Sequence, residues 1–279
     1  YTTVSMLGRF LYNFRNKYYL NASVRDDASS RIPEQNRHQQ FWAVGAAWEV
    51  SKEEFMQNQS VVDYLKLKAS AGVLGNQSTY HPSLSSLDYP FFPGIITGSQ
   101  AAFGTTGYIA ALPAYQKNPD LRWETVNSFE VGVEANAFKN RLHFEYNFYN
   151  KVTKDMMTYI GLGSLGYDDI IKNGGEIKNW GHEFTASWIQ KLSSDLTLTV
   201  NGNITFMKNK VLSVAEDLPG GRIIDARANN GSAEARTLPG FPIGSFYGYV
   251  VEGIYQTDLD RLVSPFAGSV GTYLNGDFK

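Results

Sequence analysis

The chain has 279 residues, a net charge of −2 and a pI of about 6.1, so it lacks the basic surface typical of nucleic-acid-binding proteins. It has no cysteine, which excludes a disulfide framework and thiolate metal sites. The absence of any apolar run of about 18 residues excludes a helical membrane protein. Aromatic residues make up 14% although the mean hydropathy is −0.29, a combination that alternating transmembrane β-strands produce.

Residues 5–25 are predicted to form a β-hairpin. Their side chains alternate with a period of two on both sides of a polar turn at 15–17, with Leu20 and Val24 on one face of the second arm. Successive side chains of a strand point to opposite faces, so each arm has one apolar and one polar face. The polar segment 26–40 is predicted to be a loop.

Two further strands are predicted at 41–50 and 65–73. The first carries Trp42 and Trp48 near its ends, as an aromatic girdle at a membrane surface would. The connection 51–64 opens with a capping-box pattern and is predicted to contain a short helical turn.

Regular alternation disappears over 74–125, which is rich in Gly, Pro and aromatic residues. An irregular loop of this length argues against a compact soluble domain unless the loop is functional. Three interpretations of its aromatic side chains remain possible, namely contact with substrate, contact with a partner protein and internal packing. The residues assigned to substrate or partner contact are Tyr80, Tyr89, Phe91, Phe92, Tyr108 and Tyr115.

The segment 118–157 holds the clearest hairpin, with its turn at 137–141. Each arm has roughly 10 residues, the length that a tilted strand needs to cross a bilayer. A third hairpin is predicted at 183–206, and a ninth strand at 244–255. The side chains predicted to face lipid are Trp42, Trp48, Val131, Phe144, Tyr146, Phe148, Phe184 and Trp188.

Short and long connections alternate strictly along the chain. The short ones are 15–17, 51–64, 137–141 and 190–195, and the long ones are 26–40, 74–125, 152–180 and 207–243. An outer-membrane β-barrel has this arrangement, because its periplasmic turns are short and its outer loops are long. The pattern therefore predicts an all-β, antiparallel transmembrane barrel whose long loops face outside the cell.

Neither an enzyme nor a cofactor is predicted. The four His lack ligand spacing, and Asp168 and Asp169 are better explained as solvated loop acids than as Ca²⁺ ligands. Glu130, Glu134 and Glu145 have the residue type of a glycosidase carboxylate pair. In a barrel, however, they belong to strand faces that meet water or a plug.

Seven blocks, in this order, resemble the SusC/RagA-like TonB-dependent outer-membrane transporters of Gram-negative bacteria. The blocks are LNASVRDDASSR (20–31), FWAVGAAWEVSKEEFM (41–56), LKLKASAGVLGNQ (65–77), NPDLRWET (118–125), FKNRLHFEYNFYNKVTKDMM (138–157), NGGEIKNWGHEFT (173–185) and PGFPIGSFYGYVVEGIYQT (239–257). The resemblance departs from the family pattern at Ile32 and Pro33, where an aromatic residue and glycine are usual.

The resemblance implies a 22-stranded barrel in the cell outer membrane, of which this chain supplies about nine strands. Residues 1–257 would belong to the barrel and 258–279 to a tail leading to its final strands, with the plug domain and the TonB-contacting segment outside this chain. The implied function is import of an oligosaccharide or peptide with a SusD-like lipoprotein partner. A metal-chelate (siderophore) receptor without that lipoprotein, a passive porin-like barrel and a soluble carbohydrate-binding module remain alternatives.

Overall fold

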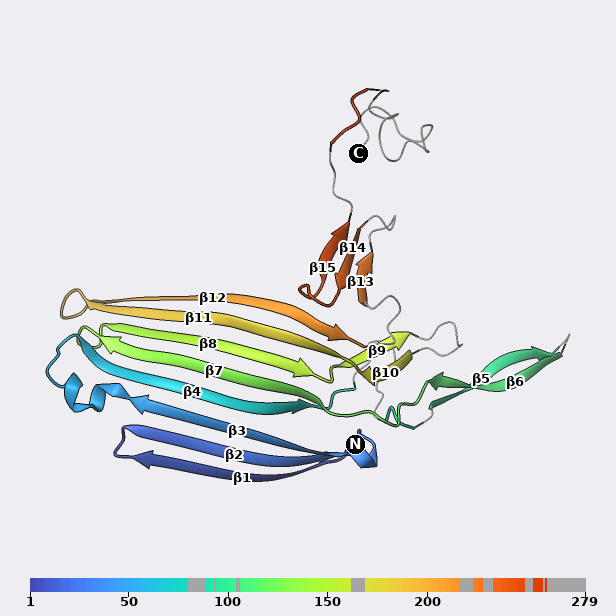
Figure 1. The fold of residues 1–279 in the computed structure, drawn as a ribbon, viewed down its shortest axis with the longest axis horizontal. Helices are drawn as coiled ribbons and strands as arrows, with labels where there is room; N and C mark the ends of the chain where they lie inside the picture. Colours follow the sequence, from blue (N-terminus) through green and yellow to red (C-terminus); the bar gives the residue numbers. More distant parts are fainter. Residues whose placement is uncertain are drawn as a thin grey trace. The chain divides into compact units, whose positions relative to one another are not determined.

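The computed structural model describes most of the chain as β-structure (Figure 1). The described residues are 1–79, 89–92, 94–103, 106–161, 169–215, 223–227, 233–248, 253–257 and 259. They divide into two compact units, which are residues 1–222 with 238–243, and residues 223–237 with 244–279. No helix in the described part is long and apolar enough to span a membrane.

The first unit is built on an eight-stranded antiparallel sheet in which each strand pairs with the next one of the sheet along the chain (Figure 1). Its strands, in spatial order, are β1 (Thr3–Phe14), β2 (Tyr18–Ser29), β3 (His38–Glu49), β4 (Val62–Asn76), β7 (Glu124–Ala137), β8 (Leu142–Lys154), β11 (Gly175–Lys191) and β12 (Thr197–Val214). They have 12 to 18 residues, more than the 9–11 that a tilted membrane-crossing strand requires. The predicted all-β antiparallel fold is therefore confirmed.

Connections at one end of the sheet are short except for 50–61, and those at the other end are long except for 30–37, which has fewer residues than 50–61. The predicted alternation of short and long connections therefore holds for the other connections but not for this pair. The short-connection end holds 15–17, 50–61, 138–141 and 192–196, and the long-connection end holds 30–37, 77–123 and 155–174. The tight turns use left-handed backbone conformations, with φ of 54° at Arg15 and 55° at Asn16. The backbone N–H of Asn16 donates to Asn13 Oδ1 at 3.0 Å, which stabilises the first turn.

The predicted loop boundaries were too wide. Strand β2 reaches Ser29 and β3 begins at His38, so Ala28 pairs with His38 inside the predicted loop 26–40. Near this end both strands continue with polar residues. Their composition looks like that of a loop, although their backbones remain paired. A short 3₁₀ turn, η1 (Glu34–Asn36), lies in what remains of the loop.

Two of the long connections also contain hairpins that were predicted to be irregular. Strands β5 (Gly94–Phe103) and β6 (Thr106–Tyr115) pair within 74–125, and β9 (Met157–Gly161) and β10 (Asp169–Asn173) pair within 152–180. The β5 and β6 sequences are rich in Gly, Ala and Thr, so they lack the apolar face from which strands are recognised. The predicted helical turn in 51–64 is present as η2 (Val50–Lys52) and η3 (Glu54–Met56), but neither has a side-chain cap.

Residues 249–252 of the ninth predicted strand, 244–255, lie outside the described residues, and its described part does not join the eight-stranded sheet. In the second unit, β15 (Ser245–Gly248) pairs with β14 (Ala233–Thr237), and β14 pairs with β13 (Ile223–Arg227). Both β13 and β14 lie within the predicted loop 207–243. Apart from Leu259, the predicted tail 258–279 lies outside the described residues.

The buried core of the first unit lies at the long-connection end of the sheet. It consists of side chains from three connections and one strand, here called the loop core: Ile32, Phe41, Leu121, Trp123 and Ile171. The Phe41 and Trp123 rings meet edge to face at 5.6 Å. The sheet between its ends holds few buried apolar side chains, so packing orders the connections rather than the strands.

Hydrogen bonds tie the same connections together. Trp123 Nε1 donates to the Arg37 carbonyl at 2.9 Å, and buried Asn118 donates through Nδ2 to the Ile171 carbonyl at 2.9 Å. Asn173 Nδ2 donates to the Arg122 carbonyl at 2.8 Å. The block 118–125, which the sequence marked only by resemblance, is therefore the structural centre of the long connections.

Gly75 is required beside the loop core, because a Cβ at this position would overlap the Phe41 ring. We expect Gly75→Ala to destabilise the full-length protein by about 1–3 kcal/mol, since Phe41 must move away from Trp123. The measurement is the temperature at which the folded, fast-migrating form is lost in semi-native electrophoresis. Gly202→Ala is the matched control, because a Cβ there meets no atom within 4 Å, and it should leave that temperature unchanged.

Candidate functional site

Strand pairing sorts the side chains of the sheet into two faces, because residues directly opposite each other share a face. One row of opposing residues defines the polar face, and it runs Asn13, Tyr19, Ala47, Lys68, Gly132, Asn147, Glu183 and Thr205. The neighbouring row defines the apolar face, and it runs Phe14, Tyr18, Trp48, Leu67, Val133, Tyr146, Phe184 and Ile204. Both rows cross all eight strands without a break.

A hollow of about 390 Å³ lies in the polar face over β2, β3, β4, β7, β8 and β11. Glycines make room for it. A Cβ at Gly132 would overlap the Asn147 side chain, and one at Gly45 would come within 2.9 Å of the Asn21 amide. The absence of these side chains lets long polar groups from neighbouring strands cross the sheet surface.

The hollow is lined by charges of both signs held in ion pairs. Lys68 Nζ contacts Glu145 Oε1, and Lys151 Nζ lies 3.2 Å from Glu130 Oε1. Lys66 Nζ lies 5.1 Å from the centre of the Tyr19 ring. This arrangement can bind a ligand that carries both charges by exchanging partners.

The polar face also shows what Glu130, Glu134 and Glu145 do. Glu130 and Glu145 are ion-paired wall residues, as the lysine contacts show, and Glu134 lies opposite Glu145 in register. Within the described ranges, no group of three His, Asp or Glu side chains is placed to hold a metal ion.

All eight residues predicted to face lipid lie on the apolar face. Tyr146 and Phe184 are opposite each other with ring centres 4.9 Å apart, and Val131 is opposite Phe148. The remaining register partners on this face are Trp42 with Val24, Trp48 with Tyr18, Phe144 with Ala186, and Trp188 with Leu142.

The short-connection end of the apolar face carries a belt of aromatic side chains. Phe14, Tyr18 and Trp48 stack in series at 6.4 to 6.5 Å, and Phe138 lies 6.1 Å from Trp188. Phe14, Tyr18 and Trp48 lie within one residue of a strand end, Phe138 follows the last residue of β7, and Trp188 lies three residues before the end of β11. The belt therefore lies along the short-connection end of the sheet.

Glu53, in the connection between β3 and β4, anchors this belt. Its carboxylate accepts hydrogen bonds from Tyr18 Oη at 2.6 Å, from Lys17 Nζ at 3.0 Å and from Trp48 Nε1 at 3.0 Å. These donors favour the charged form and lower the pKa of Glu53 from 4.5 to about 2. Of the belt residues, Trp48 and Trp188 were expected from the sequence, whereas Phe14, Tyr18, Phe138 and the carboxylate partner were not.

Of the six aromatic residues predicted to contact substrate or partner, three come together. Tyr89, Phe91 and Phe92 form a cluster with ring centres 4.5 to 6.3 Å apart, and Phe92 is 57% exposed. A hydrogen bond attaches the cluster to the segment that carries the loop core residues Leu121 and Trp123. In this bond the backbone N–H of Asn118 donates to the Pro90 carbonyl at 3.0 Å.

Two of the other three residues belong to β6. Tyr108 is an exposed residue of β6, and Tyr115 is the last residue of the same strand. Tyr80 lies outside the described residues.

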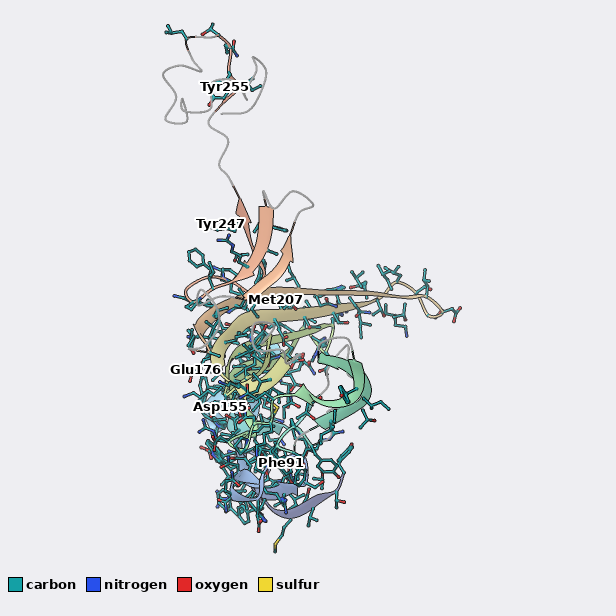
Figure 2. The ribbon with its side chains drawn as sticks, turned by 90° about the vertical axis from the view of Figure 1, so that its right-hand side faces the viewer. Phe91, Asp155, Glu176, Met207, Tyr247 and Tyr255 are labelled. Atoms are coloured by element: carbon teal, nitrogen blue, oxygen red, sulfur yellow. The ribbon has the colours of Figure 1, made fainter. Side chains whose placement is uncertain are left out.

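The long-connection end is viewed in Figure 2, where Phe91, Asp155 and Glu176 are labelled. Asp155 follows β8 and lies 3.6 Å from the Arg122 guanidinium, and Glu176 lies near the start of β11. No pattern in the sequence predicts the ion pair of Arg122 with Asp155, because it joins two connections that are far apart along the chain.

The bonds to Glu53 predict an acid-sensitive belt. Because its folded pKa of about 2 is below the usual 4.5, Glu53 contributes stability above about pH 4.5, and this contribution is lost as the pH falls through 2. In the full-length protein, Trp48 fluorescence should therefore change with a midpoint near pH 2. The change should vanish in Glu53→Gln and persist in the matched variant Glu54→Gln, and a midpoint near 4.5 would contradict the assignment.

Comparison with known proteins identifies the family. Residues 2–279 match the family model described as TonB dependent receptor-like, beta-barrel. The chain is 30% identical over 259 residues to TonB-dependent receptor P26 of Formosa agariphila, covering 91% of this chain and 25% of that protein. It is 26% identical to TonB-dependent receptor SusC of Bacteroides thetaiotaomicron, covering 89% and 25%.

Solved structures agree with the sequence comparison. A structure of the RagAB peptide transporter matches with a TM-score of 0.75 and 26% identity over 92% of this chain and 26% of that chain. The RagAB peptide importer in its open-open state matches with a TM-score of 0.71 and 25% identity, covering 91% and 26%. The chain thus spans about a quarter of the length of these relatives. It belongs to the TonB-dependent receptor β-barrel family.

Proposed function

We propose that this chain forms part of the wall and the outer connections of a TonB-dependent nutrient importer of the SusC/RagA type in the outer membrane. The observation that carries the proposal is the two-faced sheet. Its polar face holds the hollow with paired charges, and its apolar face holds the aromatic belt. Edge strands β1 and β12 would pair with further strands of the complete, multi-pass barrel.

In this proposal the apolar face contacts lipid and the polar face meets the water-filled interior or a plug. Backbone polar groups cannot be left unpaired in hydrocarbon, and each inner strand of this sheet pairs on both sides. The eight predicted residues, from Trp42 to Trp188, are then lipid contacts. The short connections lie in the periplasm, and the long connections face outside.

The long connections are the natural contact for a surface lipoprotein and for substrate. The cluster of Tyr89, Phe91 and Phe92 is held by the loop core and keeps Phe92 exposed, so it offers a preformed aromatic surface. Together with Tyr80, Tyr108 and Tyr115, it is proposed to contact a SusD-like lipoprotein or the substrate. Capture by that lipoprotein, followed by TonB-driven displacement of the plug, would complete uptake without covalent chemistry on this chain.

The charges of the polar face favour a peptide over a neutral oligosaccharide. Lys68 with Glu145 and Lys151 with Glu130 offer charges of both signs, which can pair with the charged termini and side chains of a peptide. The similar RagAB structures are described as those of a peptide importer. Uptake of labelled oligopeptides should therefore be lost when the full-length gene is deleted and should return on complementation.

Other results of this uptake experiment would select the alternatives. Loss of oligosaccharide uptake alone would change the substrate class, and loss of chelated iron uptake alone would favour a metal-chelate receptor. Uptake that persists without TonB would indicate a passive porin. Purification of the full-length protein without a surface lipoprotein would argue against the SusD-like partner.

Neighbouring residues at the middle of β4 test the face assignment. Ala69 lies on the apolar face opposite Val131, and Ser70 lies on the polar face opposite Glu130. Both side chains are small and exposed. We expect Ala69→Arg to impair assembly, because an arginine at the lipid midplane costs about 2–4 kcal/mol.

Ser70→Arg is the matched control and should assemble normally, because its guanidinium would reach Glu130 in the polar hollow. The readout is the amount of folded, heat-modifiable full-length protein in the outer-membrane fraction. Equal effects of the two substitutions would show that the faces are wrongly assigned.

A further inference from the structure

Three lysines lie on the apolar face of β11 and β12, toward the long-connection end. Lys178 is opposite Lys210, and Lys208 is opposite Trp180. Lys178 is an even number of residues from Phe184 on β11, and the opposing residues Lys208 and Lys210 lie on the same face of β12. Because Phe184 belongs to the apolar row, all three lysines lie on the apolar face. Lys178, Lys208 and Lys210 are here called the lysine patch.

The patch lies at the level where the apolar band of a membrane ends. Trp188, in the aromatic belt, and Trp180 are eight residues apart on β11. At about 3.3 Å per residue and a tilt of about 40°, this separation is about 20 Å along the membrane normal. Lys178 lies two residues further, at about 25 Å, which is the height of the apolar band of an outer-membrane barrel.

The part of the chain that the structure describes does not neutralise the lysines of the patch. None of them makes an ion pair with any residue that the structure describes. Lys178 Nζ lies 5.4 Å from the Trp180 ring, and Lys208 and Lys210 are exposed.

Only one carboxylate shares this face on β8, β11 and β12. It belongs to Glu176, which lies 3.8 Å from another lysine of the face, Lys154. The face therefore carries four lysines against one carboxylate at this end. On the polar face, by contrast, Lys68 and Lys151 are paired with carboxylates.

Polar and aromatic groups beside the patch suit the sugar and acyl parts of a lipid. A hollow of about 560 Å³ is lined by residues of β11 and β12, among them Trp180, His182, Phe206 and Lys208. His182 Nδ1 lies 2.9 Å from Tyr146 Oη, so a hydrogen-bonding pair lies next to exposed aromatic surface. An aromatic ring can stack on a sugar while Phe206 contacts an acyl chain.

We propose that the lysine patch binds the phosphate groups of an anionic glycolipid in the outer leaflet of the membrane. The proposal rests on the proposed function, which places the long-connection end outside. Clustered lysines at a membrane surface bind phosphorylated headgroups through charge. The patch lies on the lipid-contacting face rather than on the connections, so a lipid reaches it directly and a lipoprotein seated over the long connections does not.

The test measures binding of bisphosphorylated lipid A and of its dephosphorylated form to the full-length protein in detergent, by native mass spectrometry. Wild type should prefer the phosphorylated lipid at least tenfold. Replacing Lys178, Lys208 and Lys210 together with glutamine should abolish this preference, whereas replacing them with arginine should retain it. If the glutamine variant does not fold, Lys210→Gln alone should reduce the preference measurably.

A matched control removes three lysines from the short-connection end, namely Lys52, Lys139 and Lys191, and should keep the preference. Equal binding of the two lipids to wild type, or an equal loss in the control, would overturn the proposal. Outer-membrane fractionation of the same strains separates the two hypotheses. Protein absent from that fraction contradicts the proposed function, whereas protein present there without lipid preference contradicts only the lysine patch.

Discussion

The pairing of backbone groups between neighbouring strands is the constraint on which the rest of this structure depends. In hydrocarbon an unpaired N–H or C=O has no water to bond, so a membrane-crossing sheet must pair each strand continuously with its neighbours. The sheet of this chain meets that requirement, because its eight antiparallel strands pair continuously and their register shifts only near strand ends, at Val62/Tyr64 and at Glu176/Ile177. Because a slip of one residue would exchange the two faces of a strand, the same pairing also fixes which side chains share the hollow and which share the aromatic belt.

The two ends of the sheet are stabilised in different ways. At the short-connection end, stacked rings and the Glu53 carboxylate hold the turns with little buried volume. At the long-connection end, the loop core buries Leu121 and Trp123 and hydrogen-bonds segments from three connections. A rigid base of this kind allows the outer parts of the long connections to vary without disturbing the strands, which suits segments that select ligands.

The strands and their faces were predictable from the sequence because alternation is a local property. Val131 and Phe148, for example, follow from a period of two within each arm, and the structure places them opposite each other. The strand ends were not predictable, since residues such as Asp27 and Gln39 pair through the backbone although both are polar. The hollow, the role of Glu53 and the loop core depend on contacts between segments that are distant along the chain. Such contacts are visible in the strand register and the tertiary packing, but not in a single sequence.

The distribution of charge gives the two faces different electrostatic characters. On the polar face lysines are matched by carboxylates from neighbouring strands, so the local field is small and a ligand can exchange one ion pair for another. On the apolar face the middle of the sheet is free of charge along the row from Phe14 to Ile204, and lysines collect toward the long-connection end of β8, β11 and β12. An uncompensated cluster at that level is costly unless an anion accompanies it, and in the proposed orientation the adjacent anions are lipid headgroups.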